Sequence, residues 1–262
     1  HCQRGIEMEN KKKETTKIDI ILTNYNSFEF ITETVKSILN QTYKNWKLII
    51  VDDFSDKKTR SLLKKISKKK NIKVYFMKQN RGAGFCRNYA IKKSGSPYLA
   101  FIDSDDIWKR DKLTKQIKFI KKNNFSFSYT NYETFGLKKR KVKNPSKLNY
   151  FDFLKNTSIA TSTMIIKRSL IGKTKFTNTK ICEDYYFKCK LLTKTKYAYC
   201  LNQYLTKYRI RKNSLQSSNL RNFFWIWKIN KDLNKLNFID NFISLFFISV
   251  NSLKKYGGKN IF

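Results

Sequence analysis

The first half of the chain alternates short apolar runs with amphipathic stretches, and this alternation limits the possible folds more than any other feature. Four apolar runs of five or six residues are typical of buried strands, and they cover 18–23, 46–51, 72–77 and 98–102. Between the first two runs, Ile31, Val35 and Ile38 recur at helical spacing. Strands joined by helices in this order build a parallel, doubly wound sheet, in which ligands bind beyond the carboxyl ends of the strands. The sequence therefore predicts an α/β fold with a binding site at that edge.

The pattern changes after residue 124, where strands and helices no longer alternate. We expect strands at 126–132 and 162–166, with a loop or hairpin at 138–143 between them. A helix is expected at 185–192 and short strands at 197–210. Residues 1–16 are predicted to be disordered, and 219–262 to be a helical extension rich in Phe, Trp and Ile. The expected organisation is one α/β domain over 17–218, divided near residue 124.

The chain is strongly basic, with 56 Lys and Arg against 19 Asp and Glu and a formal net charge of +37. The Lys residues are spread along the whole chain, without an arginine-rich arm or a compact basic helix, so no specific nucleic-acid partner is expected. Anionic lipid headgroups or anionic substrates fit the same charge.

Cysteine and histidine usage excludes several kinds of site. The five Cys form no C-x-x-C pair and are odd in number, which argues against a disulfide framework or a zinc site and favours a reducing, cytoplasmic compartment. The one His is His1, so no histidine base is expected inside the domain. The first residues lack the apolar core of a signal peptide, and the sequence leaves open whether 1–7 precede a natural start at Met8.

The C-terminal region has two interpretations. No run reaches the length of about 18 apolar residues that a transmembrane helix needs. The aromatic stretches 223–227 and 242–248 fit helices, and Lys254 and Lys255 follow the second one. A basic amphipathic helix can lie in a membrane interface, here the inner face of the cell membrane, but such helices can equally pack on the domain or in a homodimer. Both interpretations remain open.

An acidic cluster, Asp103-Ser104-Asp105-Asp106, follows the fourth apolar run. Three carboxylates at the end of a buried strand repel one another unless something positive lies among them. Mg²⁺ or Mn²⁺ carrying a diphosphate would supply that charge, because these ions prefer oxygen ligands and are often held by one or two carboxylates plus substrate phosphates. Alternatively, Asp105 or Asp106 caps a helix that begins near residue 109.

Three further groups are candidates for the same site. Asp52 and Asp53 end the second run, where a carboxylate can accept a hydrogen bond from a nucleobase or can cap the next helix. Gly82 opens a loop-to-helix junction suited to anions, and Arg87 could face a diphosphate or pair with a surface carboxylate. Glu183-Asp184 could supply a general base, or could simply interact favourably with the dipole at the start of a helix.

These blocks together resemble family 2 glycosyltransferases of the GT-A fold. The resemblance covers about 17–235, and the second half is similar to bacterial members that make teichuronic acid or other surface polysaccharides. Five blocks of the first half occur in that family's order and spacing, and they are 20–26, 37–42, 49–56, 80–88 and 101–106. Phe54 departs from the pattern, since Gly is usual after the paired Asp.

The resemblance implies an inverting, non-processive hexosyltransferase-like enzyme (EC 2.4) that uses a nucleoside-diphosphate sugar, most simply a UDP-sugar, and Mn²⁺ or Mg²⁺. It implies a nucleotide-binding half at 17–124 and an acceptor half at 125–218, with a saccharide or lipid-linked acceptor. The metal ligand would be Asp105, and the base would be Asp184 with Glu183 beside it. The nucleotide-sugar contacts that it implies are Thr23, Asn24, Tyr25, Asp52, Asp53, Gly82, Arg87, Asp103, Ser104 and Arg209.

Two alternatives stay open on the sequence. A sugar-phosphate nucleotidyltransferase also uses nucleotides and metal on an α/β sheet, but the Gly-rich loop it needs after the first strand is replaced by Thr23-Asn24-Tyr25-Asn26. A non-catalytic basic binding module would have no use for Asp103, Asp105 and Asp184.

Overall fold

The computed structural model describes residues 16–212 and 219–256 of the chain. Apart from Thr16, the segment expected to be disordered lies outside the described residues, as does the end of the C-terminal extension after residue 256. The division of the chain into domains remains a prediction.

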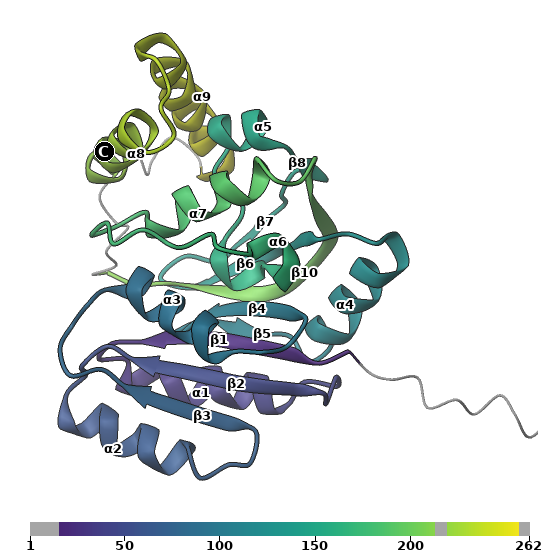
Figure 1. Cartoon of the computed structure of the whole chain (residues 1–262), viewed down its shortest axis with the longest axis vertical. Coiled ribbons are helices and arrows are strands. Elements are labelled where there is room, and N and C mark those ends of the chain that lie inside the picture. Colours follow the sequence, from purple (N-terminus) through teal and green to yellow (C-terminus); the bar gives the residue numbers. More distant parts are fainter. Residues whose placement is uncertain (1–15, 213–218, 257–262) are drawn as a thin grey trace, which may run out of the picture.

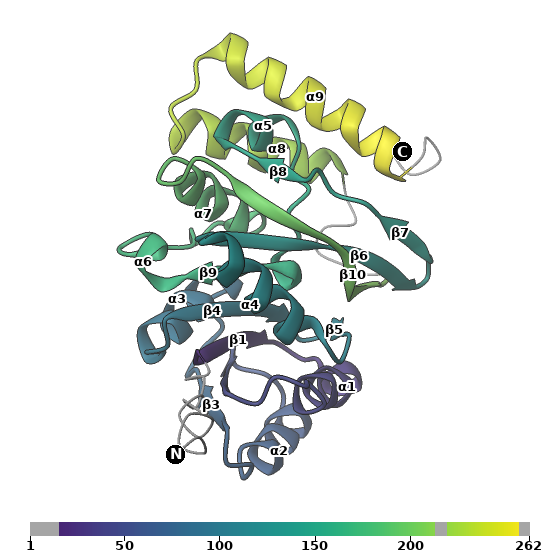
Figure 2. The same ribbon diagram turned by 90° about the vertical axis from the view of Figure 1, so that its right-hand side faces the viewer.

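The predicted doubly wound sheet is confirmed (Figures 1 and 2). Its four parallel strands are β1 (Ile18–Asn24), β2 (Trp46–Asp52), β3 (Ile72–Phe76) and β4 (Tyr98–Asp103). The helices that accompany them are α1 (Phe28–Leu39), α2 (Lys57–Ile66), α3 (Ala83–Lys93) and α4 (Lys112–Asn123). Strand β1 is apolar on both faces because helices cover both sides: Ile20 and Leu22 pack in one core and Ile21 in the other.

The remaining strands, all but β5 from the second half, join the same sheet. They are β5 (Ile107–Trp108), β6 (Phe127–Gly136), β7 (Arg140–Val142), β8 (Lys147–Leu148), β9 (Ile165–Lys167) and β10 (Ala198–Ile210). Strand β9 runs antiparallel to β4, while β6 and β10 are parallel to each other, so the described sheet has the order β3-β2-β1-β4-β9-β6-β10-β5. The hairpin expected at 138–143 is present, with β7 paired to β6.

Two expectations for this half were wrong in detail. The region 197–210 forms one long strand instead of several short ones, because β10 stays paired with β6 across two register shifts between Leu201 and Thr206. The segment 162–166 begins as a 3₁₀ turn, Thr161–Thr163, and becomes strand only at Ile165.

The remaining helices belong to the second half and the C-terminal extension. They are α5 (Tyr150–Lys155), α6 (Arg168–Ile171), α7 (Glu183–Leu192), α8 (Asn219–Asp232) and α9 (Phe238–Tyr256). Helices α8 and α9 lie at the end of the molecule opposite α2 (Figures 1 and 2). The extension expected after residue 219 is therefore helical through Tyr256. Among the described residues, no helix combines the length and apolar character needed to cross a membrane.

Candidate active site

The carboxyl ends of β1, β2 and β4 bring the predicted residues of three strands to one edge. Thr23 is paired in register with Asp103, and Asn24 with Asp52. Thr23 is half-buried and Tyr25, which follows the strand, is 54% exposed. The parallel sheet thus places an open aromatic side chain next to a row of polar groups.

Asn24 and Asp52 form the buried support of this edge. The Asn24 amide donates to Asp52 Oδ1 over 2.7 Å, and Ser55 Oγ donates to the same oxygen over 2.6 Å. Both Asn24 and Asp52 are buried. The cap of α2 is Asp56, which accepts from the Thr59 amide over 2.7 Å, so the paired Asp residues do not cap that helix.

Asp53 ties the end of β2 to the glycine loop. Its two carboxylate oxygens accept from the backbone N–H groups of Arg81, over 2.7 Å, and Gly82, over 2.8 Å. Gly82 has φ +85°, a conformation that favours glycine, and a Cβ there would meet no heavy atom within 4 Å. The hydrogen bonds to Asp53 therefore fix the loop, and free space remains beside Gly82 just before α3.

Phe54 occupies the position where the family pattern has Gly. Its φ is +65°, in the left-handed region, which explains why a residue without Cβ is usual there. The side chain is 49% exposed, and the Arg60 guanidinium lies 6.0 Å from the ring centroid. The chain thus accepts a strained backbone next to Asp53 and presents an aromatic ring to solvent.

Arg87 connects the strand edge to α7. From α3 this buried residue donates to Asp103 Oδ1 over 2.8 Å and also to Glu183. Burial alone would lower the pKa of the guanidinium, but the two carboxylates outweigh it and raise that pKa. The partners of Arg87 are these two site carboxylates, not an exposed surface acid.

The acidic cluster is held by two arginines of the segment that ends β10. Arg211 Nε lies 2.8 Å from Asp105 Oδ2, and Arg209 Nε donates to the Asp105 carbonyl over 2.9 Å. The Ser104 carbonyl accepts from Thr34 of α1 over 3.0 Å. Burial raises the pKa of the Asp105 carboxyl, although the Arg211 charge opposes the change. Arg209 thus contacts the cluster twice: its guanidinium contacts Asp105, and its backbone amide contacts Asp106.

Asp106 is not a helix cap. It is buried, with Oδ2 accepting from Ser162 Oγ over 2.5 Å and Oδ1 from the Arg209 amide over 2.9 Å. Helix α4 begins later, at Lys112, with Asp111 at its N-cap position. Through these hydrogen bonds, Asp106 instead links the end of β4 to β10 and to the 3₁₀ turn.

The residues at this edge fit a divalent cation. Within the described ranges, no three His, Cys, Asp or Glu side chains gather as a complete metal cage. Asp105 carries hard oxygen atoms of the kind these ions prefer, and one of them is paired with the Arg211 guanidinium. Mg²⁺ and Mn²⁺ sites commonly use one or two carboxylates and take the remaining ligands from phosphates and water. The donor set therefore suits a cation that arrives with a diphosphate.

Glu183 and Asp184 begin α7, after Cys182 in a left-handed conformation with φ +58°. Asp184 Oδ2 accepts from Thr161 Oγ1 over 2.6 Å and from Lys188 Nζ over 2.5 Å. Burial alone would raise the pKa of the Asp184 carboxyl, but the charges of Lys188 and Arg87 lower it to about 2. Burial raises the pKa of Glu183 against the opposing charge of Arg87. Asp184 is therefore ionised throughout the neutral range.

Close packing brings α3 and α7 together. A Cβ added at Gly84 would stand 2.0 Å from the Thr177 carbonyl and 3.2 Å from the Glu183 Cβ. Only glycine allows this approach, and the approach puts Glu183 within reach of Arg87.

The sequence interpretation missed three residues of this site. Lys188 lies four residues after Asp184, a spacing that places both on one helix face and could have been noticed. Thr161 and Arg211 meet their partners only through tertiary contacts, so no local pattern marks them.

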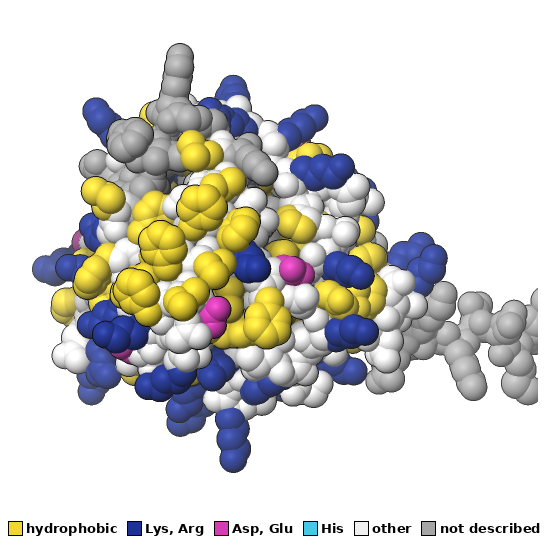
Figure 3. All heavy atoms as spheres, turned by 90° about the horizontal axis from the view of Figure 1, so that it is seen from above, with side chains coloured by type: hydrophobic (Ala, Val, Ile, Leu, Met, Phe, Trp, Pro, Cys, Tyr) yellow, Lys and Arg dark blue, Asp and Glu magenta, His cyan; other side chains and the backbone are white. Residues whose placement is uncertain are grey.

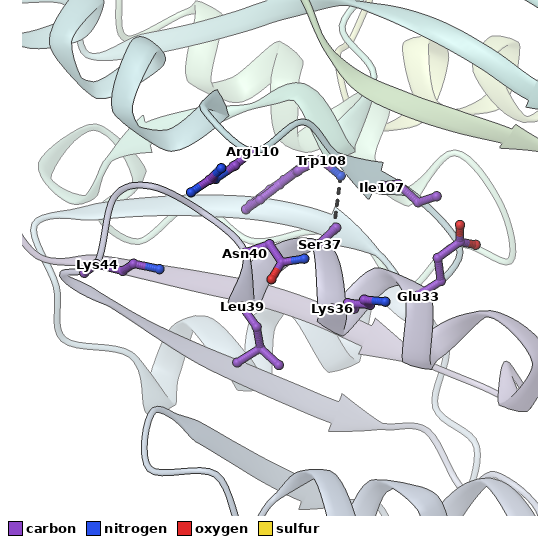
Figure 4. A pocket seen from close by; sticks show the side chains of 9 residues that line it. All are labelled: Glu33, Lys36, Ser37, Leu39, Asn40, Lys44, Ile107, Trp108 and Arg110. Atoms are coloured by element: carbon purple, nitrogen blue, oxygen red, sulfur yellow. Dashed lines mark hydrogen bonds between the residues drawn. The ribbon is translucent and has the colours of Figure 1, made fainter.

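Two hollows lie near the edge. One, of about 710 Å³, is lined by Arg209 and Arg211 together with the start of α1. Another, of about 670 Å³, lies between α1 and β5 and is lined by none of the predicted site residues (Figure 4). There Ser37 Oγ accepts from the Trp108 amide over 3.2 Å. The first hollow adjoins the acidic cluster through its arginines, and the second is separate from the described chemistry.

Comparison with known proteins gives consistent matches. Residues 19–186 match the family model of glycosyl transferase family 2. A Bacillus subtilis (strain 168) protein named as a teichuronic acid biosynthesis glycosyltransferase, TuaG, is 34% identical over 227 residues, covering 85% of this chain and 90% of that protein. The Escherichia coli UDP-Glc:alpha-D-GlcNAc-diphosphoundecaprenol beta-1,3-glucosyltransferase WfgD is 32% identical over 237 residues, covering 89% and 91%.

Solved structures share the fold at low identity. S. aureus TarS 1–349 in complex with UDP-GlcNAc has a TM-score of 0.70 at 20% identity, covering 94% of this chain and 74% of that one. The mannosyltransferase PcManGT from Pyrobaculum calidifontis, in complex with GDP-Man and Mn²⁺, has a TM-score of 0.69 at 15% identity, covering 95% and 73%.

Proposed function

The chain belongs to glycosyl transferase family 2 and has the GT-A fold, and on that premise we propose that it is an inverting, non-processive transferase that moves a sugar from a nucleoside-diphosphate donor to a hydroxyl acceptor. The observation that carries the proposal is the buried Arg87 bridge, which joins the strand-edge carboxylate Asp103 to Glu183, beside the ionised Asp184. A donor edge and a candidate base thus form one connected site. A nucleotidyltransferase or a non-catalytic module would not need this link.

We propose a UDP-sugar as donor and a lipid-linked or saccharide acceptor in bacterial surface polysaccharide synthesis. The names of TuaG and WfgD support this direction, and so does the UDP-GlcNAc complex of TarS. Cys86, Cys182, Cys189 and Cys200 are free thiols, which supports a reducing compartment such as the cytoplasm.

At the donor edge, we assign contacts with the nucleotide to open groups. Tyr25 and Phe54 are the exposed aromatic side chains beside the ends of β1 and β2, suited to a base, and Gly82 leaves room for backbone approach. Asn24, Asp52 and Asp53 shape the edge from beneath through their hydrogen bonds. We assign Asp103, at the end of β4, to the ribose.

Asp105 would hold a divalent cation, which when bound supplies positive charge to the departing diphosphate. Arg209 and Arg211 lie beside Asp105 and add fixed positive charge at the same place. Their role here is electrostatic, because a guanidinium keeps its proton and cannot serve as an acid at neutral pH.

We assign Asp184 Oδ1 as the atom that removes the acceptor proton. Thr161 and Lys188 both bind Oδ2, which orients the carboxylate. As the proton moves to Asp184, the acceptor oxygen forms a bond to the anomeric carbon. The bond from that carbon to the diphosphate breaks on the opposite face, and the electron pair leaves with the nucleoside diphosphate. One carboxylate suffices because the leaving group is stabilised by charge instead of a proton.

A donor screen tests this proposal. The purified chain is incubated with UDP-, GDP- and dTDP-sugars and candidate hydroxyl acceptors, in Mn²⁺, in Mg²⁺ and in chelator, and release of nucleoside diphosphate is measured. We expect release from a UDP-sugar that depends on acceptor and divalent cation. Nucleotide binding without transfer to any hydroxyl acceptor, or no nucleotide binding, would contradict the proposal.

A further inference from the structure

Helices α8 and α9 present an apolar surface to the outside. We call this surface the aromatic face, and its members are exposed by 41% to 72%: Phe224, Phe238, Ile239, Phe242, Phe246 and Phe247. Figure 3 shows hydrophobic side chains gathered over this end of the molecule, with Lys and Arg mostly around the margin. A patch of this kind marks an interaction surface, because soluble monomers rarely leave large contiguous apolar areas in water.

The inner side of the same helices combines apolar and polar groups, with Ile226, Ile229 and Ile248 buried in the core beside a polar cluster. Asn230, Asn241 and Ser244 are almost fully buried, and the Asn230 amide donates to Asn241 Oδ1 over 3.2 Å and to Ser244 Oγ over 3.1 Å. Ser244 in turn donates to the Leu154 carbonyl of α5 over 2.6 Å. The layer thus buries apolar and polar groups inward and still presents a second set of apolar side chains outward, whereas a helix on a soluble protein normally exposes a polar face. The outward side of α9 therefore suits surroundings less polar than water.

The geometry of α9 suits a helix that lies on a surface. Its 19 residues extend for about 28 Å. A helix inserted across a bilayer could not keep Asn241 and Ser244 in their buried contacts with α8 and α5, and α9 does not meet the requirements for a membrane span. The polar contacts instead fix α9 to the protein body with its aromatic side outward.

The charge around the face selects an anionic lipid surface over a second copy of the chain. Residues 219–256 contain six Lys or Arg against two Asp. Lys155 Nζ lies 5.4 Å from the ring centroid of Phe247, and Lys228 Nζ lies 5.5 Å from that of Trp225. Lys side chains beside aromatic rings fit the headgroup region of a bilayer. A second copy would bring one net charge of +37 against another, which opposes association.

We propose that the aromatic face docks on anionic phospholipid, with α9 parallel to the bilayer. Docking would also fix the distance between the proposed base Asp184 and the bilayer. The link is Tyr185, next to Asp184, whose hydroxyl donates to buried Asn230 Oδ1 over 2.9 Å. That second consequence rests on the proposed function, since it matters only for a lipid-linked acceptor. The docking itself does not.

Vesicle binding tests the proposal without donor or acceptor, so its outcome is independent of the proposed activity. Binding is measured by sedimentation with vesicles of phosphatidylglycerol and phosphatidylcholine, and with phosphatidylcholine alone. We expect binding to the anionic vesicles, weakened about tenfold or more in Phe242→Ser/Phe246→Ser. We expect Lys228→Gln/Lys231→Gln to weaken binding more than the matched pair Lys68→Gln/Lys69→Gln, which lies just beyond α2 at the opposite end.

A second measurement needs no substitution and reports insertion directly. Trp46 and Trp108 are buried in the sheet domain, whereas Trp225 and Trp227 are partly exposed on α8. Brominated lipids in the anionic vesicles should therefore quench fluorescence of the wild-type chain. Equal vesicle binding by the two-Phe variant, absence of quenching, or a solution dimer that the two-Phe variant dissociates would overturn the proposal.

Discussion

The strand edge that carries the proposed active site and the C-terminal layer that carries the aromatic face bury different kinds of polar group. At that edge, an apolar sheet carries carboxylates out to the ends of its strands, and some of them pair with cations, as Asp103 does with Arg87 and Asp105 with Arg211. In the α8–α9 layer, neutral amides and a hydroxyl are buried and the Phe side chains face outward. The first region is organised to bind charge from solution, and the second to meet a surface less polar than water.

Different interactions stabilise the two regions. The strand edge buries charged groups such as Arg87, whose contribution depends on pairing and pH. The buried Asn230, Asn241 and Ser244 of the C-terminal layer are uncharged and depend only on hydrogen-bond geometry. Substitutions should therefore affect the two regions differently.

The largest effect should come from Asp184→Asn, which keeps an oxygen for Lys188 but removes the proposed proton acceptor. We expect turnover to fall about 10²- to 10⁴-fold, the range for loss of a general base. Because the pKa of Asp184 is lowered to about 2, protonation of this carboxylate should not reduce the turnover of the wild type near neutral pH. The measurement is glycoside formation at saturating donor, with Asp232→Asn on exposed α8 as control. Turnover within about tenfold of wild type would remove Asp184 as the base.

Arg87→Met should cost the next largest amount. It leaves Asp103 and Glu183 without their shared cation in a largely buried place, a change worth about 3 kcal/mol or more of unfolding free energy. Urea unfolding measures this, with Arg60→Met on α2 as control, where the guanidinium lies over the Phe76 ring. Arg87→Lys should be intermediate, because one ammonium cannot bind both carboxylates as the planar guanidinium does. A stability loss no greater than that of the control would show that the bridge is not structural.

Asn241→Leu tests the other region. It removes the acceptor of Asn230 and the donor to the Trp227 carbonyl, so about 1–3 kcal/mol of unfolding free energy should be lost although the side chain becomes more apolar. Exposed Asn123→Leu at the end of α4 is the control and should change stability little. If Asn241→Leu were stabilising, the layer would be an ordinary apolar packing and the contrast would fail.

The smallest effect concerns pH. Lys112 is fully buried beside Gln116, and burial lowers its pKa from the ordinary 10.5 to about 7. Between these values the unfolded chain binds a proton that the folded chain does not, so stability should rise with pH across this window. Relative to Lys112→Met, the wild type should gain at most about 1.4 kcal/mol per pH unit. Urea unfolding near neutral pH and about one unit higher measures the gain. Exposed Lys118→Met should keep the wild-type slope, and a flat wild-type curve would contradict the prediction.

The sequence predicted the catalytic half better than the rest for a physical reason. Apolar runs such as 46–51 are long enough to mark buried strands, and parallel strands must end at a common edge, so Asp52 and Asp103 could be placed together without any structure. The partners of those carboxylates were harder to foresee. Arg211 reaches Asp105 across more than a hundred residues, and Arg87 turns toward Glu183 through a close approach at Gly84.

The C-terminal layer shows what spacing cannot decide. The aromatic residues of 242–248 fit a helix, but helical spacing fits an inward face as well as an outward one. The tertiary contacts of Asn241 and Ser244, together with the burial of Ile248, fix the aromatic side outward. The register shifts of β10 were unpredictable for a similar reason, since they depend on pairing with β6.

We propose that donor binding and proton removal belong to separate parts of one site. The direct test is the shift in melting temperature caused by UDP with Mn²⁺ in the wild type, Asp105→Asn and Asp184→Asn, with GDP and dTDP in parallel. A ligand at about a hundred times its Kd stabilises a fold by about 2.7 kcal/mol. We predict equal shifts for the wild type and Asp184→Asn, and a shift that is lost in Asp105→Asn. Loss of the shift in Asp184→Asn, or a full shift in Asp105→Asn, would contradict the claim.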